Sequence, residues 1–430
     1  MGQFSRSSTE ILKFFLIWEF MNDTILIKSS NVFDGISFVG RKEILVRDGK
    51  IVNVGNGISC KNVIDLGDMF ISPGFIDAHI HFGGFKFDEF AQSFVYERDE
   101  SRLLSCIPSL KKVLDSGFTT VRACGGKYDI HLRDGVKAGY IDGPDIIAAG
   151  NALTQTFGHG ELSHTLPVEL VDGYFGKVCD GVPECIKATR TVLRDGADFI
   201  KIITTGGALS QGDSPDNEQF TLEEVRAIVN EARKVGTYVA AHAEGDPGIR
   251  IAMEGGVSFI EHGSMAKRET IKLMAEKGIS LTPTLSVFKI IEELSSHGNL
   301  PRRTGEKITP ILELAGSTVT IARDMGVNIM TGTDIIGPTG TQIDYGSNWM
   351  EIVLLSEMGG LSQLEALRTA TGNCVALGKK IGRIESGFKA DIIGIDGNPL
   401  ENIRDASKVS MVMKSGKVVK MENGQSKEVV

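Results

Sequence analysis

The sequence predicts an α/β protein in which a (β/α)8 TIM barrel is joined to a small β-sandwich domain formed from both chain ends. Three observations support this fold class. The chain has 430 residues, 41% hydrophobic and 23% charged, which is enough for about two to three packed domains. Both ends alternate apolar and polar residues, as strands do. The long middle region repeats short apolar runs separated by stretches with a helical period.

The two chain ends carry matching β-rich segments. Residues 24–28 and 43–54 alternate apolar and polar side chains around an Asp-Gly turn, which is a hairpin signal. Residues 390–395 and 409–419 repeat this pattern. Neither segment has enough strands to be stable by itself, so we expect the two to pair. The predicted discontinuous β domain comprises residues 21–72 and 380–430.

The residues that precede this domain do not fit the predicted fold. Residues 11–21 are apolar enough to suggest a signal peptide, but Lys13 and Glu19 interrupt them and no small-residue cleavage site follows. We therefore expect residues 1–20 to be an N-terminal extension outside the fold, with a secretory signal as the alternative.

Eight apolar runs in the middle region are predicted barrel strands. They comprise residues 75–79, 119–123, 145–149, 199–203, 238–242, 258–261, 280–283 and 328–331. Helical stretches follow several of them, such as residues 221–233, where Thr221 and Glu224 form a capping box. Eight such repeats favour a closed barrel over residues 73–379. An open doubly wound sheet would more often carry a G-x-G-x-x-G loop after its first strand, and none occurs there.

Composition restricts the classes of partner. Acidic residues outnumber basic ones by 55 to 46, and the formal net charge of -9 argues against nucleic-acid or membrane binding. The sequence contains no uncharged apolar run long enough to predict a transmembrane span. The six cysteines lie far apart without a C-x-x-C pair, which is typical of reduced thiols. We therefore expect a cytoplasmic protein that acts on small molecules.

Ionisable side chains close several of the predicted strands. His79 and His81 end the first strand, and alternate residues of a strand face the same way, so both imidazoles can point into the barrel mouth. His242, His262 and Asp334 close the fifth, sixth and eighth strands. Each residue alone has a simpler interpretation as a cap or a hydrogen-bonded core residue. Together they occupy the face where barrel active sites are built, and their donor atoms suit Zn²⁺, Mn²⁺, Fe²⁺ or Co²⁺.

Lys201 lies within the otherwise apolar fourth strand. If its side chain faces the helices, the ammonium can reach solvent or an ion-pair partner at the rim. If it faces inward it needs a partner, because an isolated buried ammonium is costly. The spacing alone leaves both orientations open.

The order of these residues resembles the metal-dependent amidohydrolase superfamily: His-x-His on strand one, lysine on strand four, histidines on strands five and six, and aspartate on strand eight. It is similar to the binuclear subtype, in which CO₂ carboxylates the lysine. The likeness covers nearly the whole chain from about residue 24, including the split β domain. It implies a hydrolase that needs two divalent metal ions, with zinc the favoured ion.

The resemblance also implies a role for each residue. Three residues would hold the more buried metal: His79, His81 and Asp334. His242 and His262 would hold the more exposed metal, and carboxylated Lys201 would bridge the two. A hydroxide shared by the metals would attack the scissile carbonyl, while Asp334 acts first as general base and then as general acid.

Three further segments, residues 151–160, 200–210 and 219–224, resemble the imidazolonepropionase-related group. This group includes Xaa-Pro dipeptidases, carboxypeptidases that release C-terminal amino acids, and ochratoxinase-like amidases. In these relatives the histidine that matches His159 hydrogen-bonds the substrate carbonyl or its oxyanion. The alternative is a histidine that only stabilises its loop.

Two residues depart from the pattern of this group. Phe157 stands where relatives commonly have a glycine, and Phe220 lies near the position of a tyrosine in some dipeptidases. Both are predicted substrate contacts that reshape the pocket. His164, in the same loop as His159, is a further candidate contact, with an exposed loop residue as the alternative.

These inferences predict a binuclear amide hydrolase that releases a C-terminal amino acid from a dipeptide or an N-acyl amino acid. The preferred side chain stays open among proline, hydrophobic, basic and aromatic residues. The family resemblance also implies a homo-oligomer. One alternative is a hydrolase or deaminase of a nitrogen heterocycle, which would use one metal and no lysine from strand four. A noncatalytic scaffold on the same barrel is the other.

Overall fold

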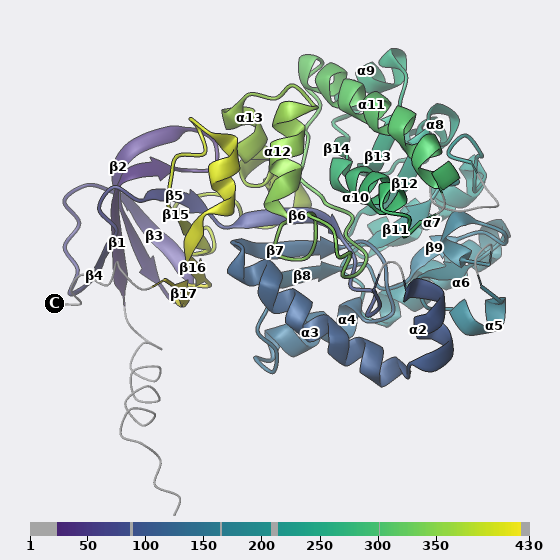
Figure 1. Ribbon diagram of the computed structural model, residues 1–430, viewed down its shortest axis with the longest axis horizontal. Helices are drawn as coiled ribbons and strands as arrows, with labels where there is room; N and C mark the ends of the chain where they lie inside the picture. Colours follow the sequence, from purple (N-terminus) through teal and green to yellow (C-terminus); the bar gives the residue numbers. More distant parts are fainter. Residues whose placement is uncertain (1–23, 87–88, 164–165, 208–213, 301, 423–430) are drawn as a thin grey trace, which may run out of the picture.

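The computed structural model describes residues 24–86, 89–163, 166–207, 214–300 and 302–422. The predicted extension, residues 1–20, lies outside these described residues. Figure 1 shows two parts of the molecule side by side: a sheet built from both chain ends, and a larger part in which parallel strands and helices alternate.

Strands from both chain ends form one eight-stranded sheet. Its order is β17-β16-β15-β5-β1-β2-β3, and β4 pairs with β1. The two ends meet where β5 pairs antiparallel with β15. The strands of this sheet are β1 (Ile25–Phe33), β2 (Phe38–Arg47), β3 (Lys50–Gly55), β4 (Asn62–Asp65), β5 (Phe70–Pro73), β15 (Ile392–Ile395), β16 (Val409–Lys414) and β17 (Lys417–Met421).

Two tight turns close hairpins at opposite ends of the chain. Asp48 and Gly49 join β2 to β3 with φ angles of 51° and 73°, and Ser415 and Gly416 join β16 to β17 with 50° and 75°. Positive φ at both central residues is the type I′ geometry that matches the twist of the flanking strands. The hairpins also touch, because a Cβ at Gly49 would lie 3.1 Å from the carbonyl oxygen of Ser415. The hairpin predicted at the Asp-Gly turn is therefore confirmed.

Parallel strands form the second part of the fold. One sheet has the order β6-β7-β8 and the other the order β10-β9-β11-β12-β13-β14. Their bounds are β6 (Phe75–Ile80), β7 (Phe118–Ala123), β8 (Asp145–Ala148), β9 (Ala152–Thr154), β10 (Gly176–Val178), β11 (Ile200–Ile203), β12 (Val239–Gly245), β13 (Phe259–Met265) and β14 (Ser280–Thr282). Seven of these strands match predicted runs, whereas the short β9 and β10 were not expected from the sequence.

The prediction of an eighth strand at residues 328–331 is wrong. This segment forms only an isolated bridge between Ile329 and Leu281. Its pairing with β14 stops because the amide of Thr331 donates to the carbonyl of Thr369, which is the last residue of a helix. The chain nevertheless occupies the expected place, between β14 and β6.

Backbone hydrogen bonds join the two parallel sheets at both sides. The amide of Asp198, just before β11, donates to the carbonyl of Ala148 in β8 at 2.8 Å. On the other side, the amide of Ala78 in β6 donates to Thr331 and the amide of Asp334 donates to His79, both at 2.7 Å. The carboxyl-terminal ends of strands from both sheets are thereby brought together.

Helices follow the parallel strands and cover them (Figure 1). The α7 helix begins with the predicted capping box, in which Thr221 accepts from the Glu224 amide and Glu224 accepts from that of Thr221. The helices are α2 (Phe90–Tyr96), α3 (Asp99–Asp115), α4 (Asp129–Lys137), α5 (Val168–Val171), α6 (Gly181–Arg194), α7 (Leu222–Lys234), α8 (Asp246–Gly255), α9 (Arg268–Lys277), α10 (Leu285–Ser296), α11 (Arg302–Asp324), α12 (Trp349–Glu357) and α13 (Gln363–Thr369). Within the described part of the chain, none of them combines the length and apolar character needed to cross a membrane.

Candidate metal centre

One cavity of about 70 Å³ gathers the residues that the sequence singled out. All six predicted ligands and the predicted carbonyl-binding histidine line it: His79, His81, Lys201, His242, His262, Asp334 and His159. Lys201 therefore faces inward, which decides between the two orientations that its spacing left open. His164 lies outside the described residues.

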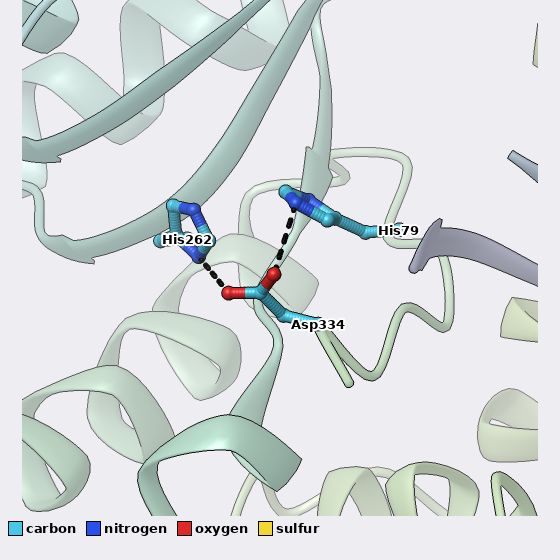
Figure 2. A group of neighbouring side chains, drawn as sticks. All are labelled: His79, His262 and Asp334. Carbon is cyan, nitrogen blue, oxygen red and sulfur yellow. Dashed lines mark ion pairs between the residues drawn. The ribbon is translucent and has the colours of Figure 1, made fainter. Parts of the chain in front are cut away.

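Asp334 lies between imidazoles from two strands. One of its oxygens is 3.0 Å from Nε2 of His81 and 3.4 Å from Nε2 of His79, and the other is 4.0 Å from Nδ1 of His262. Figure 2 shows His79 and His262 each facing a different oxygen of this carboxylate. Ligand atoms of His79, His262 and Asp334 all lie within 4.8 Å of one another, close enough to hold one metal ion. This arrangement fits a metal centre with nitrogen and oxygen ligands.

The backbone at this centre adopts conformations that non-glycine residues rarely take. His262 has φ 69° and Asp334 has φ 54°, both in the left-handed region. Such conformations persist only where the surrounding structure enforces them, and they are concentrated at functional sites. The hydrogen bond from the Asp334 amide to the His79 carbonyl fixes the turn that aims the carboxylate at the imidazoles.

Hydrogen bonds from outside the cavity orient three of the imidazoles. Nδ1 of His79 lies 2.7 Å from Oε2 of Glu261, and Nδ1 of His81 lies 2.7 Å from the carbonyl oxygen of Gly125. Nδ1 of His262 lies 2.7 Å from the hydroxyl of Thr284. Partners of this kind fix ring orientation and tautomer in metal sites. For His79 and His81 they leave Nε2 directed at Asp334.

A buried arginine supports His79 through Glu261. Arg122 donates from Nη2 to Oε1 of Glu261 at 2.6 Å and from Nε to the Ala78 carbonyl at 2.5 Å, and both charged side chains are fully buried. Sequence reasoning missed this pair. The available signal was a charged residue inside each of two buried strands, β7 and β13.

Three of the imidazoles are held in the neutral form that binds metals. Burial is the main cause that pushes the pKa of His79, His242 and His262 well below the usual histidine range, and neighbouring imidazoles and Lys201 add to it. Burial alone would raise the pKa of Asp334, but its interactions with His79 and His81, including the hydrogen bond to His81, outweigh burial and hold this pKa below its ordinary value. A carboxylate among neutral imidazoles is a suitable ligand set for a divalent cation.

Lys201 is 2% exposed, and its Nζ has no hydrogen-bond partner among the residues that the structure describes. An unpaired ammonium in such a place is expensive. The position is therefore suited to a modified or metal-compensated lysine rather than to a free one.

A second group with metal-ligating atoms, His79, Cys124 and Glu261, lies deeper. Burial raises the pKa of the Cys124 thiol to about 12, so that it stays protonated. Because Glu261 is paired with Arg122, this group offers a poorer ligand set than the cavity does.

His159 covers the cavity and stacks on His242, with ring centroids 4.7 Å apart and an interplanar angle of 21°. Its amide donates to Oε1 of Gln219 at 3.0 Å, and the amide of Phe220 donates to Oε1 of Gln155 at 2.8 Å. These reciprocal bonds clamp the loop of His159 to the segment before α7. A Cβ at Gly207 would overlap the His159 ring, so the close approach requires glycine.

The two predicted phenylalanine contacts lie away from the cavity wall. Phe157 is 60% exposed and Phe220 is buried, and both have positive φ, 62° and 60°. Neither lines the cavity among the described residues, so their contact with substrate stays a prediction. Residues that do line it and were not singled out are Phe175, Ile203, Glu244, Val287, Phe288, Ile291 and Ile336.

Comparisons with known proteins point to one family. Residues 70–419 match the model of a family described as the amidohydrolase family. Ochratoxinase of Aspergillus niger is 33% identical over 383 residues, which cover 81% of this chain and 75% of the relative. Imidazolonepropionase of Thermoanaerobacter pseudethanolicus is 22% identical over 383 residues, covering 82% of this chain and 83% of the relative.

Solved structures are similar over almost the whole chain. A Xaa-Pro dipeptidase with bound methionine in its active site superposes with a TM-score of 0.82 at 33% identity, covering 92% of this chain and 100% of that one. The A. niger ochratoxinase structure gives a TM-score of 0.83 at 29% identity, covering 93% and 96%.

Proposed function

Since this chain belongs to the amidohydrolase family, we propose that it is a binuclear metal-dependent enzyme that releases a C-terminal amino acid from a dipeptide or an N-acyl amino acid. The family and its 33% identity to ochratoxinase make it a hydrolase that acts on amide bonds. The observation that carries the finer proposal is the convergence on one cavity of five histidines, the Asp334 carboxylate, and a lysine whose Nζ has no hydrogen-bond partner among the described residues.

The proposed ligands divide into two sets. His79, His81 and Asp334 would hold one ion and His242 and His262 the other, with Lys201, carboxylated by CO₂, between them. Carboxylation replaces the positive charge of Lys201 by a negative one, which removes the cost of the unpaired ammonium. Zinc suits this nitrogen and oxygen donor set. When bound, the ions would supply Lewis-acid polarisation of the substrate carbonyl and an activated water.

Residues of the chain would carry the proton and orient the substrate. Asp334, whose pKa is held low by His79 and His81 against the effect of burial, is ionised at neutral pH. It would accept the proton of the attacking water and pass it to the leaving amine. His159 would donate a hydrogen bond to the carbonyl oxygen as negative charge develops there.

The cavity wall supports an apolar side chain in the substrate. Val287, Phe288 and Ile291 come from one face of α10, and Phe175 and Ile336 complete the apolar part of the lining. A proline, aliphatic or aromatic residue would bury its surface there. This interpretation agrees with the two relatives named as an ochratoxinase and a Xaa-Pro dipeptidase.

The architecture that we infer for this function is a closed (β/α)8 barrel over residues 73–379 and a β domain of residues 21–72 and 380–430. The described strands of that domain form one sheet rather than the two packed sheets of the predicted sandwich. The hydrogen bonds of Ala148 with Asp198 and of Ala78 with Thr331, which join the two parallel sheets, support the closure. A cytoplasmic homo-oligomer stays a prediction from the sequence.

The test is metal analysis together with turnover. Protein reconstituted with zinc is expected to hold two ions per chain and to cleave members of a panel of Xaa-Pro, Xaa-hydrophobic and Xaa-basic dipeptides and an N-aroyl phenylalanine. Lys201→Ala should lose metal and activity, and Asp334→Asn should lose activity. His131→Ala, on exposed α4 surface, is the control and should retain both.

Two results would overturn this proposal. Two bound ions without turnover of any panel member would exclude the substrate class. One ion per chain, or full activity of Lys201→Ala, would favour the hydrolase or deaminase of a nitrogen heterocycle.

A further inference from the structure

We propose that Glu244 binds the free α-ammonium group of the substrate, so that the enzyme acts on unblocked dipeptides rather than on N-acyl amino acids. This inference rests on the proposed function and selects between the two substrate classes that it names. It assigns a role to a carboxylate that neither the metal ligands nor the proton transfer uses.

Glu244 lies next to the imidazoles that would hold the more exposed ion. It follows His242 by two residues on β12, and both side chains line the cavity. Ser264 follows His262 by two residues on β13, and its hydroxyl donates to Oε2 of Glu244 at 3.1 Å. Glu244 and Ser264 therefore form a layer one strand step beyond the two histidines.

The backbone around Glu244 fixes its place. The amide of Glu244 donates to the hydroxyl of Thr205 at 3.0 Å, which ties β12 to the segment after β11. Glu244 is 4% exposed, so its carboxylate is directed at the cavity rather than at solvent. A buried carboxylate is stabilised by a cation that reaches it.

Charge in the cavity wall is distributed unevenly. The other lining carboxylate, Asp334, is surrounded by imidazoles, and Lys201 is the ammonium that carboxylation would remove. The other described residues of the wall are imidazoles and aliphatic or aromatic side chains. Among the described residues, Glu244 is thus the carboxylate of the wall, besides Asp334, that a substrate ammonium can reach.

The spacing between Glu244 and the two histidines fits the amino end of a dipeptide. Its amino nitrogen lies about 2.5 Å from the carbon of the scissile carbonyl, and an ammonium binds a carboxylate at about 2.8 Å. Two residues along a strand span about 6.6 Å. An ammonium bound to Glu244 therefore leaves the scissile carbonyl beside His242 and His262. An N-acyl amino acid would instead place its uncharged acyl group next to the Glu244 carboxylate, where no ion pair can form.

A matched pair of substrates tests this role. Glycyl-phenylalanine and acetyl-phenylalanine, or the same pair with proline, share the scissile amide and differ in the ammonium group. Wild-type enzyme loaded with zinc should prefer the glycyl compound. Glu244→Gln should lower kcat/KM for the glycyl compound by about 30-fold or more, mainly through KM, because one partner of a buried charge pair is removed. For the acetyl compound the change should stay within about threefold.

Controls separate this role from a general loss of function. Glu254→Gln, on exposed α8 surface, should leave both rates unchanged. Glu244→Asp keeps the charge and should keep the preference for the glycyl compound even where its rate falls. Equal rates for the two compounds in the wild type, or equal losses for both in Glu244→Gln, would overturn this inference and leave the proposed function intact. Failure of the wild type to cleave either compound or the dipeptide panel overturns both.

Discussion

Thr284 serves the candidate metal centre instead of the helix that it precedes. It is the N-terminal cap residue of α10, with φ 54°, yet its hydroxyl makes no capping bond. The hydroxyl lies 2.7 Å from Nδ1 of His262 instead. A residue type that usually satisfies helix amides thereby orients a candidate metal ligand.

This assignment predicts the effect of removing one hydroxyl. Thr284→Val keeps the shape of the side chain but not the bond to His262, so zinc affinity should fall by about 10-fold to 100-fold. Competition with a chelator of known affinity measures the change. Thr284→Ser keeps the hydroxyl and should bind zinc nearly as the wild type does. Equal affinities in the valine and serine variants would contradict this role.

Ionisation of one residue, Asp129, should make the stability of the fold depend on pH. It is fully buried at the start of α4, and neither carboxylate oxygen accepts a hydrogen bond of good geometry from a described residue. Burial raises its pKa to about 7, and His81 and the Gly125 amide offset only part of this. A carboxyl whose pKa is raised in the native state opposes folding once it ionises, so its cost grows as pH rises from about 4 to about 7.

Asp129→Asn should therefore be more stable than the wild type at neutral and higher pH. The gain is expected to be small at pH 4 and on the order of 4 kcal/mol at pH 8. Urea unfolding of both proteins at several pH values measures it. Asp134→Asn, an exposed aspartate on the same helix, should show no such trend. A gain that does not vary with pH would show that ionisation of Asp129 is not its cause.

The convergence of the candidate ligand residues on one cavity could be predicted from the sequence, because they combine rare residue types with strand ends. His79, His242 and Asp334 are of this kind, and Lys201 stood out in an apolar run. The residues that position these candidate ligands could not be predicted from the sequence. Arg122 and Thr284 contact partners 139 and 22 positions away, and such contacts depend on the depth and register of packed strands.

At the scale of elements, a side chain of helix α12 caps the N-terminus of helix α10. Because Thr284 does not cap α10, Glu351 of α12 does so from the side. Its carboxylate accepts from the amides of Leu285 and Ser286 at 2.9 and 2.7 Å and from the Ser286 hydroxyl at 2.7 Å. Helix α10 also supplies Val287, Phe288 and Ile291 to the cavity, so Glu351 fixes the apolar wall.

Removal of this cap should therefore be costly. Glu351→Ala leaves two buried amides and a hydroxyl without their acceptor, and we expect a loss of about 2–4 kcal/mol in the free energy of unfolding. Urea denaturation measures the loss. Glu357→Ala, on the same helix but in an exposed pair with Arg404, is the control and should cost less than about 1 kcal/mol. Similar losses in the two variants would show that Glu351 has no special role.

Elements were predictable where pattern and length agreed. Seven of the eight apolar runs became strands, since each is bounded by turns and pairs with a neighbour of similar length. Residues 328–331 looked the same in sequence, but the Thr331 amide bonds to Thr369 and the ladder ends. The short β9 and β10 had no pattern of their own, because three residues are too few to show alternation.

At the scale of the whole molecule, charged side chains tie the terminal sheet to the parallel strands. Asp145 begins β8, and Lys389 and Lys414 reach it from beside β15 and from the end of β16. Lys414 also donates to the Gly143 carbonyl at 2.7 Å. The pairing of both chain ends was predictable from their matching hairpins, whereas this connection was not, because lysines and aspartates are common on every surface.

The ion pairs of Asp145 should make a pH-dependent contribution to the free energy of unfolding. Burial acts to raise its pKa, but the charges of Lys389 and Lys414 outweigh it and hold the pKa below the ordinary value. A carboxylate of this kind adds stability above the pKa of the unfolded chain, near 4, and that contribution is lost as pH falls through the folded value. Asp145→Asn should cost about 1 kcal/mol at pH 7, since the group is partly exposed, and less at pH 3.5. Urea unfolding followed by circular dichroism measures both differences, with exposed Asp142→Asn as the control. A cost that persists unchanged in acid would assign the effect of the substitution to packing rather than to the charges that join the two parts.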